Sequence, residues 1–146
     1  MNPMKNSMPE KKLEHLAFIM DGNRRWARER GLPLVEGHRK GYEKVKELGQ
    51  WCLDNGIKIV TAFAFSTENW KRSKEEVGYL MDLFALFLEK DIEEFHKKGM
   101  KLKVIGRREG LEGKIIKAID KAEEKTKNNT AGLLQLAINY GGRAEI

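Results

Sequence analysis

Short, continuous apolar runs predict four buried strands, because a strand covered on both faces is apolar at nearly every position. In chain order these runs cover about residues 13–20, 57–65, 102–105 and 133–139. Between them apolar residues recur at helical spacing, which predicts helices at about residues 23–30, 37–55, 73–98 and 111–127. This alternation predicts an α/β fold, a parallel β-sheet flanked by helices on both faces.

The predicted helix at residues 73–98 is unusually apolar in its middle, where only Gly78 and Asp82 interrupt larger apolar side chains and one alanine between residues 77 and 88. A helix packed on one side needs only an apolar stripe. The excess is compatible with a core helix, a subunit contact or the wall of a cavity for an apolar ligand. By composition alone, the core is the simplest of these explanations.

The composition is that of one folded domain. The chain has 146 residues, of which 40% are hydrophobic and 34% charged, as in a soluble globular protein. Polar residues 1–12 predict a flexible N-terminal tail, and residues 13–146 a single domain. No apolar run approaches the roughly 20 residues that span a bilayer. Cys52 is the only cysteine, which excludes an intrachain disulfide framework, so we expect a cytoplasmic protein.

The net charge of +6 is concentrated in one segment, since residues 24–40 contain six basic side chains and two acidic ones. A focused basic patch suits a polyanionic ligand, either a diphosphate or a nucleic acid. Nucleic-acid binding also calls for aromatic residues interleaved with the basic ones. Trp26 and Trp70 are too few for that, which favours a diphosphate.

The end of the first predicted strand has the features of a phosphate site. Asp21-Gly22-Asn23 follows the strand directly, and Arg24 and Arg25 open the next helix. A glycine admits a ligand close to the backbone, and guanidinium groups suit phosphate oxygens. Asp21 repels a phosphate unless a divalent cation such as Mg²⁺ lies between them. Taken alone, the tripeptide is also explained as an ordinary turn in which Asn23 caps the helix.

The loop after the second predicted strand offers hydroxyl, carboxylate, amide, indole and guanidinium groups to a polar ligand. They belong to Ser66, Thr67, Glu68, Asn69, Trp70 and Arg72. In isolation this segment is better explained as a loop leading into a helix, anchored by Trp70. However, ligands of parallel sheets bind beyond the C-terminal strand ends. We therefore expect this loop, Asp21 and residues 139–143 to form one site.

Four segments together resemble the cis-prenyltransferase family: residues 15–26 (HLAFIMDGNRRW), 37–41 (GHRKG), 63–72 (FAFSTENWKR) and 139–143 (NYGGR). Their order and spacing also fit, and the likeness covers nearly the whole chain from about His15. The family carries no Asp-rich DDxxD metal motif, and none is present here.

The resemblance implies an isoprenyl transferase that elongates an allylic (farnesyl-type) diphosphate with isopentenyl diphosphate. The product would be a cis-polyprenyl diphosphate that serves as a cell-wall lipid carrier, and Mg²⁺ would assist departure of the diphosphate. Asp21 is implied as a catalytic and Mg²⁺-binding residue, and Asn69 as the other catalytic residue. Because a carboxamide is a weak base, we expect Asn69 to position substrate while diphosphate or water accepts the proton. The implied substrate-binding residues are Gly22, Asn23, Arg24, Arg25, Trp26, His38, Ser66, Thr67, Glu68, Trp70 and Arg72, and the apolar helix would line a tunnel for the growing chain.

Two positions depart from the family pattern: Arg24 stands where members often have glycine, and Leu34 lies near a position that is often basic. Members also continue well past residue 143, with further strands, an Arg-rich isopentenyl diphosphate site and a metal-binding glutamate. We therefore expect the N-terminal part of such a protein, with the C-terminal strands missing.

The alternative is a non-catalytic diphosphate-binding subunit that another chain completes. The resemblance further implies a homodimer in the full-length form and membrane contact only through the lipid product.

Overall fold

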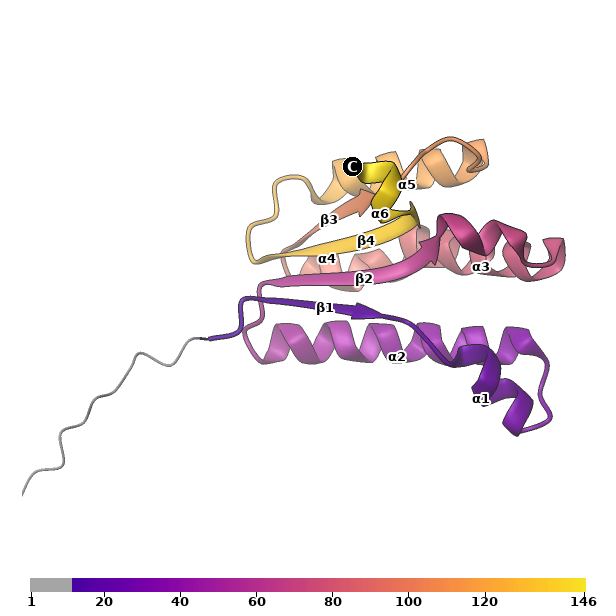
Figure 1. Cartoon of the computed structure of the whole chain (residues 1–146). Coiled ribbons are helices and arrows are strands. Elements are labelled where there is room, and N and C mark those ends of the chain that lie inside the picture. Colours follow the sequence, from indigo (N-terminus) through magenta and orange to yellow (C-terminus); the bar gives the residue numbers. More distant parts are fainter. Residues whose placement is uncertain (1–11) are drawn as a thin grey trace, which may run out of the picture.

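The computed structural model describes residues 12–146, which form a four-stranded sheet with helices packed along it (Figure 1). The sheet order is β1-β2-β4-β3, and every neighbouring pair is parallel. The strands are β1 (His15–Ile19), β2 (Ile59–Ser66), β3 (Met100–Ile105) and β4 (Gly132–Tyr140). The parallel α/β fold is therefore confirmed. Of the predicted tail, residues 1–11 lie outside the described part of the chain.

The connecting segments are helical, as predicted, with three differences in detail. They are α1 (Asn23–Glu29), α2 (Leu34–Asp54), the 3₁₀ turn η1 (Thr67–Lys71), α3 (Lys74–Leu86), the π-helical turn η2 (Phe87–Asp91), α4 (Ile92–Lys97), α5 (Gly113–Thr126) and α6 (Gly142–Glu145). Helix α2 begins three residues earlier than expected, directly after Pro33, whose ring cannot continue a preceding helix but suits a helix start. The predicted helix at 73–98 contains the π turn, and η1 was not foreseen.

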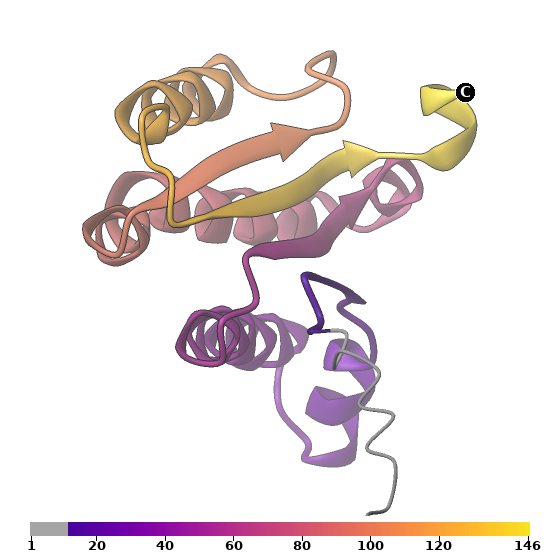
Figure 2. The ribbon, with the colours of Figure 1, turned by 90° about the vertical axis from the view of Figure 1, so that its left-hand side faces the viewer.

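The expectation of helices on both sheet faces is wrong for the described residues. Helices α2, α3 and α4 lie on one side of the sheet and α5 lies along the outer edge of β3, whereas the short α6 lies on the other side (Figure 2). The uncovered face carries a polar row in which His15 Nε2 lies 2.8 Å from Thr61 Oγ1, and Thr61 donates to Gln135 Oε1 at 3.3 Å. Ile19, on the same face of β1, is 76% exposed.

The hydrophobic core lies between the sheet and the helices on its covered face. Its largest fully buried apolar side chains come from strands and helices alike: Phe65, Ile92, Met100, Leu102, Ile115, Ile119 and Ile138. A single contiguous cluster contains them all. Helix α2 contributes Cys52 to this cluster, so the lone cysteine is a buried core residue.

Helix α5 protects the outer edge of β3. The backbone N–H of Leu102 donates to Thr126 Oγ1 at 3.0 Å, and that of Val104 donates to Glu123 Oε1 at 2.8 Å. An edge strand otherwise presents unpaired donors that invite pairing with another chain. The side chains of α5 satisfy these two donors.

Within residues 12–146, no helix is both long and apolar enough to cross a membrane.

Candidate functional site

The C-terminal ends of β1 and β2 open onto a cavity of about 390 Å³. Nine of the thirteen predicted site residues line it: Asp21, Gly22, Asn23, Arg24, Arg25, His38, Ser66, Asn69 and Arg72. They come from the loop after β1, from α1 and α2, and from the segment after β2. The structure thus brings Asp21 together with Ser66, Asn69 and Arg72, as the strand-end argument predicts. The inclusion of residues 139–143 in the same site is wrong, since none of them lines this cavity and Asn139, Tyr140 and Gly141 line a separate one.

The loop between β1 and α1 is shaped by Gly22, which has φ +83° and lies in the left-handed region. A side chain is disfavoured there, whereas glycine adopts it readily. The backbone N–H of Gly22 donates to Asp21 Oδ1 at 2.7 Å. Asp21 itself is exposed, so its second oxygen remains open to the cavity mouth.

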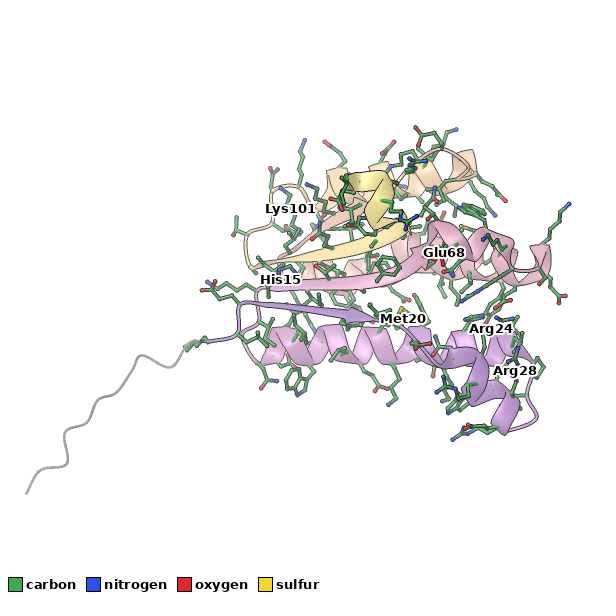
Figure 3. The ribbon with its side chains drawn as sticks, in the orientation of Figure 1. His15, Met20, Arg24, Arg28, Glu68 and Lys101 are labelled. Carbon is green, nitrogen blue, oxygen red and sulfur yellow. The ribbon has the colours of Figure 1, made fainter. Side chains whose placement is uncertain are left out.

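Two glycines of α2 let α1 approach closely. A Cβ atom on Gly37 would lie 2.1 Å from the backbone oxygen of Asn23, and one on Gly41 would lie 2.3 Å from the Asn23 side chain. Gly37 and Gly41 are four residues apart, so both lie on the same helix face. This contact fixes the start of α1, and with it the Asp21-Gly22-Asn23 loop. Figure 3 places Met20 at the end of β1, and Arg24 and Arg28 on the helix that follows.

Asn69 is held by a reciprocal contact with Ser66 at the start of η1. The backbone N–H of Ser66 donates to Asn69 Oδ1 at 3.0 Å, while the Ser66 side chain accepts from the Asn69 backbone. Because its carbonyl oxygen is engaged, the Asn69 side chain offers mainly its NH₂ group to a ligand in the cavity. That arrangement suits a positioning role better than that of a base.

Three cationic or ionisable side chains of the cavity converge behind it on buried Glu76. Its Oε1 atom lies 2.7 Å from His38 Nε2, 3.3 Å from Arg24 Nε and 3.7 Å from Arg72 Nη1. The contact with Arg24 is an ion pair without hydrogen-bond geometry. Glu76 comes from the first turn of α3, where its backbone N–H donates to Ser73 Oγ at 3.2 Å.

Four predicted site residues do not line this cavity. Trp26 lies in a neighbouring groove beneath Arg30, whose guanidinium carbon is 4.4 Å from the indole centroid. Trp70 packs on Phe65 with a centroid distance of 5.0 Å and donates its indole N–H to Asn139 Oδ1 at 2.8 Å. The remaining two are Thr67, which lies against Gly141, and Glu68, which is exposed.

Arg28 and Tyr42 line the cavity although the sequence did not single them out, whereas Leu80, Leu83 and Phe84 belong to the apolar segment at residues 77–88 that was expected either as core or as a cavity wall. Arg28 had a detectable signal, since it lies four residues after Arg24 and so on the same side of α1. Tyr42 looks like an ordinary core position of an amphipathic helix. Four residues, Met20, Tyr42, Ala64 and Phe84, also line a second, apolar cavity of about 50 Å³ between the sheet and α2, α3 and η2.

A polar cluster lies at the wall of the apolar cavity. The Tyr42 hydroxyl donates to Asp91 Oδ2, and Lys46 Nζ lies 3.3 Å from the same oxygen. Burial and the neighbouring Asp91 carboxylate raise the pKa of the Tyr42 phenol well above its ordinary value. Asp91 ends the π-helical turn, a type of irregularity that is frequent at functional sites.

Comparison with known proteins identifies the family. A family model described as putative undecaprenyl diphosphate synthase matches residues 19–146. The chain belongs to the undecaprenyl diphosphate synthase family. It is 49% identical over 133 residues to the isoprenyl transferase of Thermotoga maritima, covering 91% of this chain and 57% of that protein. It is 46% identical over 143 residues to the isoprenyl transferase of Chromobacterium violaceum, covering 97% and 57%.

Solved structures agree with this family assignment. Lavandulyl diphosphate synthase from Lavandula x intermedia, crystallised with dimethylallyl diphosphate, superposes with a TM-score of 0.87 at 36% identity and covers 91% of this chain and 57% of that one. A probable undecaprenyl diphosphate synthase from Campylobacter jejuni gives a TM-score of 0.73 at 36% identity, covering 92% and 58%. The chain thus spans a little over half the length of the relatives that it matches.

Proposed function

We propose that this chain forms the allylic half of a cis-prenyltransferase site, in which an allylic (farnesyl-type) diphosphate is elongated by isopentenyl diphosphate to a cis-polyprenyl diphosphate. Family membership supports prenyl chain elongation in general. The observation that supports the finer proposal is that a polar and an apolar cavity lie next to each other. A pocket lined by Asp21 and cationic side chains adjoins an apolar cavity, and four residues line both.

The cationic residues suit the diphosphate head group. Arg24, Arg25, Arg28 and Arg72 line the pocket together with His38. When the bond between the allylic carbon and oxygen breaks, negative charge develops on the leaving diphosphate, and fixed donors stabilise it. The NH₂ group of Asn69 is placed to hold a substrate oxygen. These residues bind and orient the diphosphate, and the apolar walls exclude water from the carbocation-like partner.

Asp21 is the residue that would hold the implied Mg²⁺ ion. Within residues 12–146, no group of three His, Cys, Asp or Glu side chains gathers as a metal site. Mg²⁺ is commonly held by one or two carboxylates together with substrate phosphates and waters. Asp21 has one free oxygen at the pocket mouth and matches that pattern. When bound, the ion would neutralise charge on the departing diphosphate.

The apolar cavity suits the isoprenoid tail, although it is far smaller than such a tail at about 50 Å³. Either α2 and α3 separate on binding or their side chains turn. The apolar middle of α3 and η2 contributes Phe84, Phe87 and Leu88 to the cavity. This supports the cavity-wall explanation for the surplus of apolar residues in that helix, alongside a core role.

A second candidate function is a diphosphate-binding subunit that another chain completes. One observation favours it: Asp21 is the only carboxylate among the residues lining the pocket. For the transferase we further propose a cytoplasmic location, homodimerisation of the full-length form, no nucleic-acid partner, and membrane contact only through the lipid product.

The decisive test is Mg²⁺-dependent incorporation of labelled isopentenyl diphosphate into farnesyl diphosphate, with Asp21→Ala as control. The same assay is run on this chain and on a longer chain continued past Ile146. Incorporation that Asp21→Ala abolishes supports the transferase. Binding of pyrophosphate by both chains without incorporation supports the partner subunit, and absence of both activities refutes the proposal.

A further inference from the structure

We propose that Glu76 is a positioning residue, a buried carboxylate that orients His38, Arg24 and Arg72 toward a diphosphate without touching it. The inference rests on the proposed function, because it concerns how the same pocket is made ready for an anion. Glu76 is 5% exposed and is not among the residues that line the pocket, whereas its three partners all line it.

The contacts leave the binding ends of the three partners free. Arg24 faces Glu76 with Nε, which leaves its two terminal Nη groups, and Arg72 uses a single Nη. His38 uses Nε2, which leaves Nδ1, and Nδ1 can donate to an anion when the ring carries a proton on both nitrogens. Each partner therefore gives Glu76 one of its polar atoms and keeps others for a ligand. Glu76 also offsets the repulsion between two guanidinium groups that lie close together.

The local sequence pattern predicts a different role for Glu76. Ser73 and Glu76 have the spacing of a capping box, in which the glutamate side chain returns to the backbone N–H of the cap residue. Only half of that box forms: Ser73 accepts from the Glu76 backbone, while the Glu76 carboxylate turns inward to the cations. A residue that does not make the contact its local sequence pattern predicts, and instead buries its charge, is typically a functional residue.

The inference makes a prediction whose sign is diagnostic. Removing a negative charge beside an anion site would, by charge alone, strengthen anion binding. If Glu76 acts by positioning, Glu76→Gln instead weakens pyrophosphate binding, by about tenfold or more, as when residues supporting a ligand site are lost. Isothermal titration with pyrophosphate measures this, at fixed salt and with and without Mg²⁺.

The matched control is Glu75→Gln, which removes the same charge from the same helical turn at an exposed position. Its pyrophosphate affinity should stay within about twofold of the wild type, as expected for an exposed charge. Unchanged or tighter binding by folded Glu76→Gln overturns the inference and leaves the proposed function standing. Failure of the wild-type chain itself to bind pyrophosphate overturns both.

Two further measurements separate positioning from a general loss of structure. In a double-mutant cycle, Arg24→Gln should weaken pyrophosphate binding in the wild type but much less in the Glu76→Gln background, and additive losses would refute the coupling. If Glu76→Gln does not fold, ¹⁵N NMR of the His38 imidazole in the wild-type protein still tests the proposed contact. A hydrogen bond to the Glu76 carboxylate requires a proton on His38 Nε2, so a ring protonated only at Nδ1 contradicts the inference.

Discussion

Substituting Gly37 by alanine should displace α1 and impair anion binding. The new Cβ would lie 2.1 Å from the backbone oxygen of Asn23, whereas ordinary contacts begin at 3.4 Å. Because a backbone atom cannot swing aside, α1 must retreat by about 1.3 Å, the difference between these two distances. Alanine gains about 1 kcal/mol of helix propensity, while such overpacking costs about 1–3 kcal/mol. We expect a net destabilisation of about 1 kcal/mol.

The loss of binding should exceed the loss of stability, because α1 carries Arg24 and Arg25 and adjoins Asp21. A displacement of about 1 Å in a binding site can cost on the order of a hundredfold in function. Calorimetric titration with pyrophosphate measures the affinity, and thermal unfolding measures the stability.

The control is Gly78→Ala in α3, since Gly78 is exposed and a Cβ atom there meets nothing within 4 Å. That variant should gain up to about 1 kcal/mol of stability and keep its affinity. If Gly37→Ala matches Gly78→Ala in both measurements, the close approach of α1 to α2 does not position the pocket.

Three other changes test individual contacts of the fold. Thr126→Val should lower the free energy of unfolding by about 1–3 kcal/mol, measured by thermal unfolding, because it leaves the Leu102 N–H without an acceptor. Thr126→Ser keeps the hydroxyl and should lower it much less. Trp70→Phe should cost about 1 kcal/mol by losing the bond to Asn139, and equal melting temperatures would contradict that bond. The raised pKa of Tyr42 means that the folded protein keeps this proton where the unfolded chain releases it. Stability should therefore fall as pH rises above about 10, and less so in Tyr42→Phe, as chemical denaturation at each pH will show.

The sequence was sufficient for the parallel sheet and for the convergence of Asp21 and the Ser66–Arg72 segment. Both follow from short-range regularities: apolar runs give strands, and parallel strands end at one edge. The same regularity failed for the far face of the sheet. Residues 13–20 were interpreted as buried on both faces, yet Ile19 is 76% exposed, because a continuous apolar run does not reveal whether a second helical layer exists.

The proposed role of Glu76 could not be predicted from the sequence, for a different reason. A capping box explained it completely at short range, and its real partners lie 38 and 52 positions earlier in the chain, at His38 and Arg24, as well as nearby at Arg72. Helical periodicity marks Tyr42 as facing inward without distinguishing a packed core from a cavity wall, and for Phe84 the sequence left both explanations open. Local sequence patterns do not show which side chains meet when they lie far apart in the chain.

The contacts between α2 and the α3–η2 segment limit how an isoprenoid tail can enter. Two polar links join them, His38 with Glu76, and Tyr42 and Lys46 with Asp91. The apolar residues that the α3–η2 segment contributes to the cavity wall, Phe84, Phe87 and Leu88, lie between Glu76 and Asp91 in the sequence. Separating the helices would break hydrogen-bonded charges in a partly buried setting, which costs more than turning an aromatic side chain. We therefore expect the cavity to enlarge by side-chain rotation, with both links intact and the cationic side chains of the pocket unmoved while the tail is accommodated.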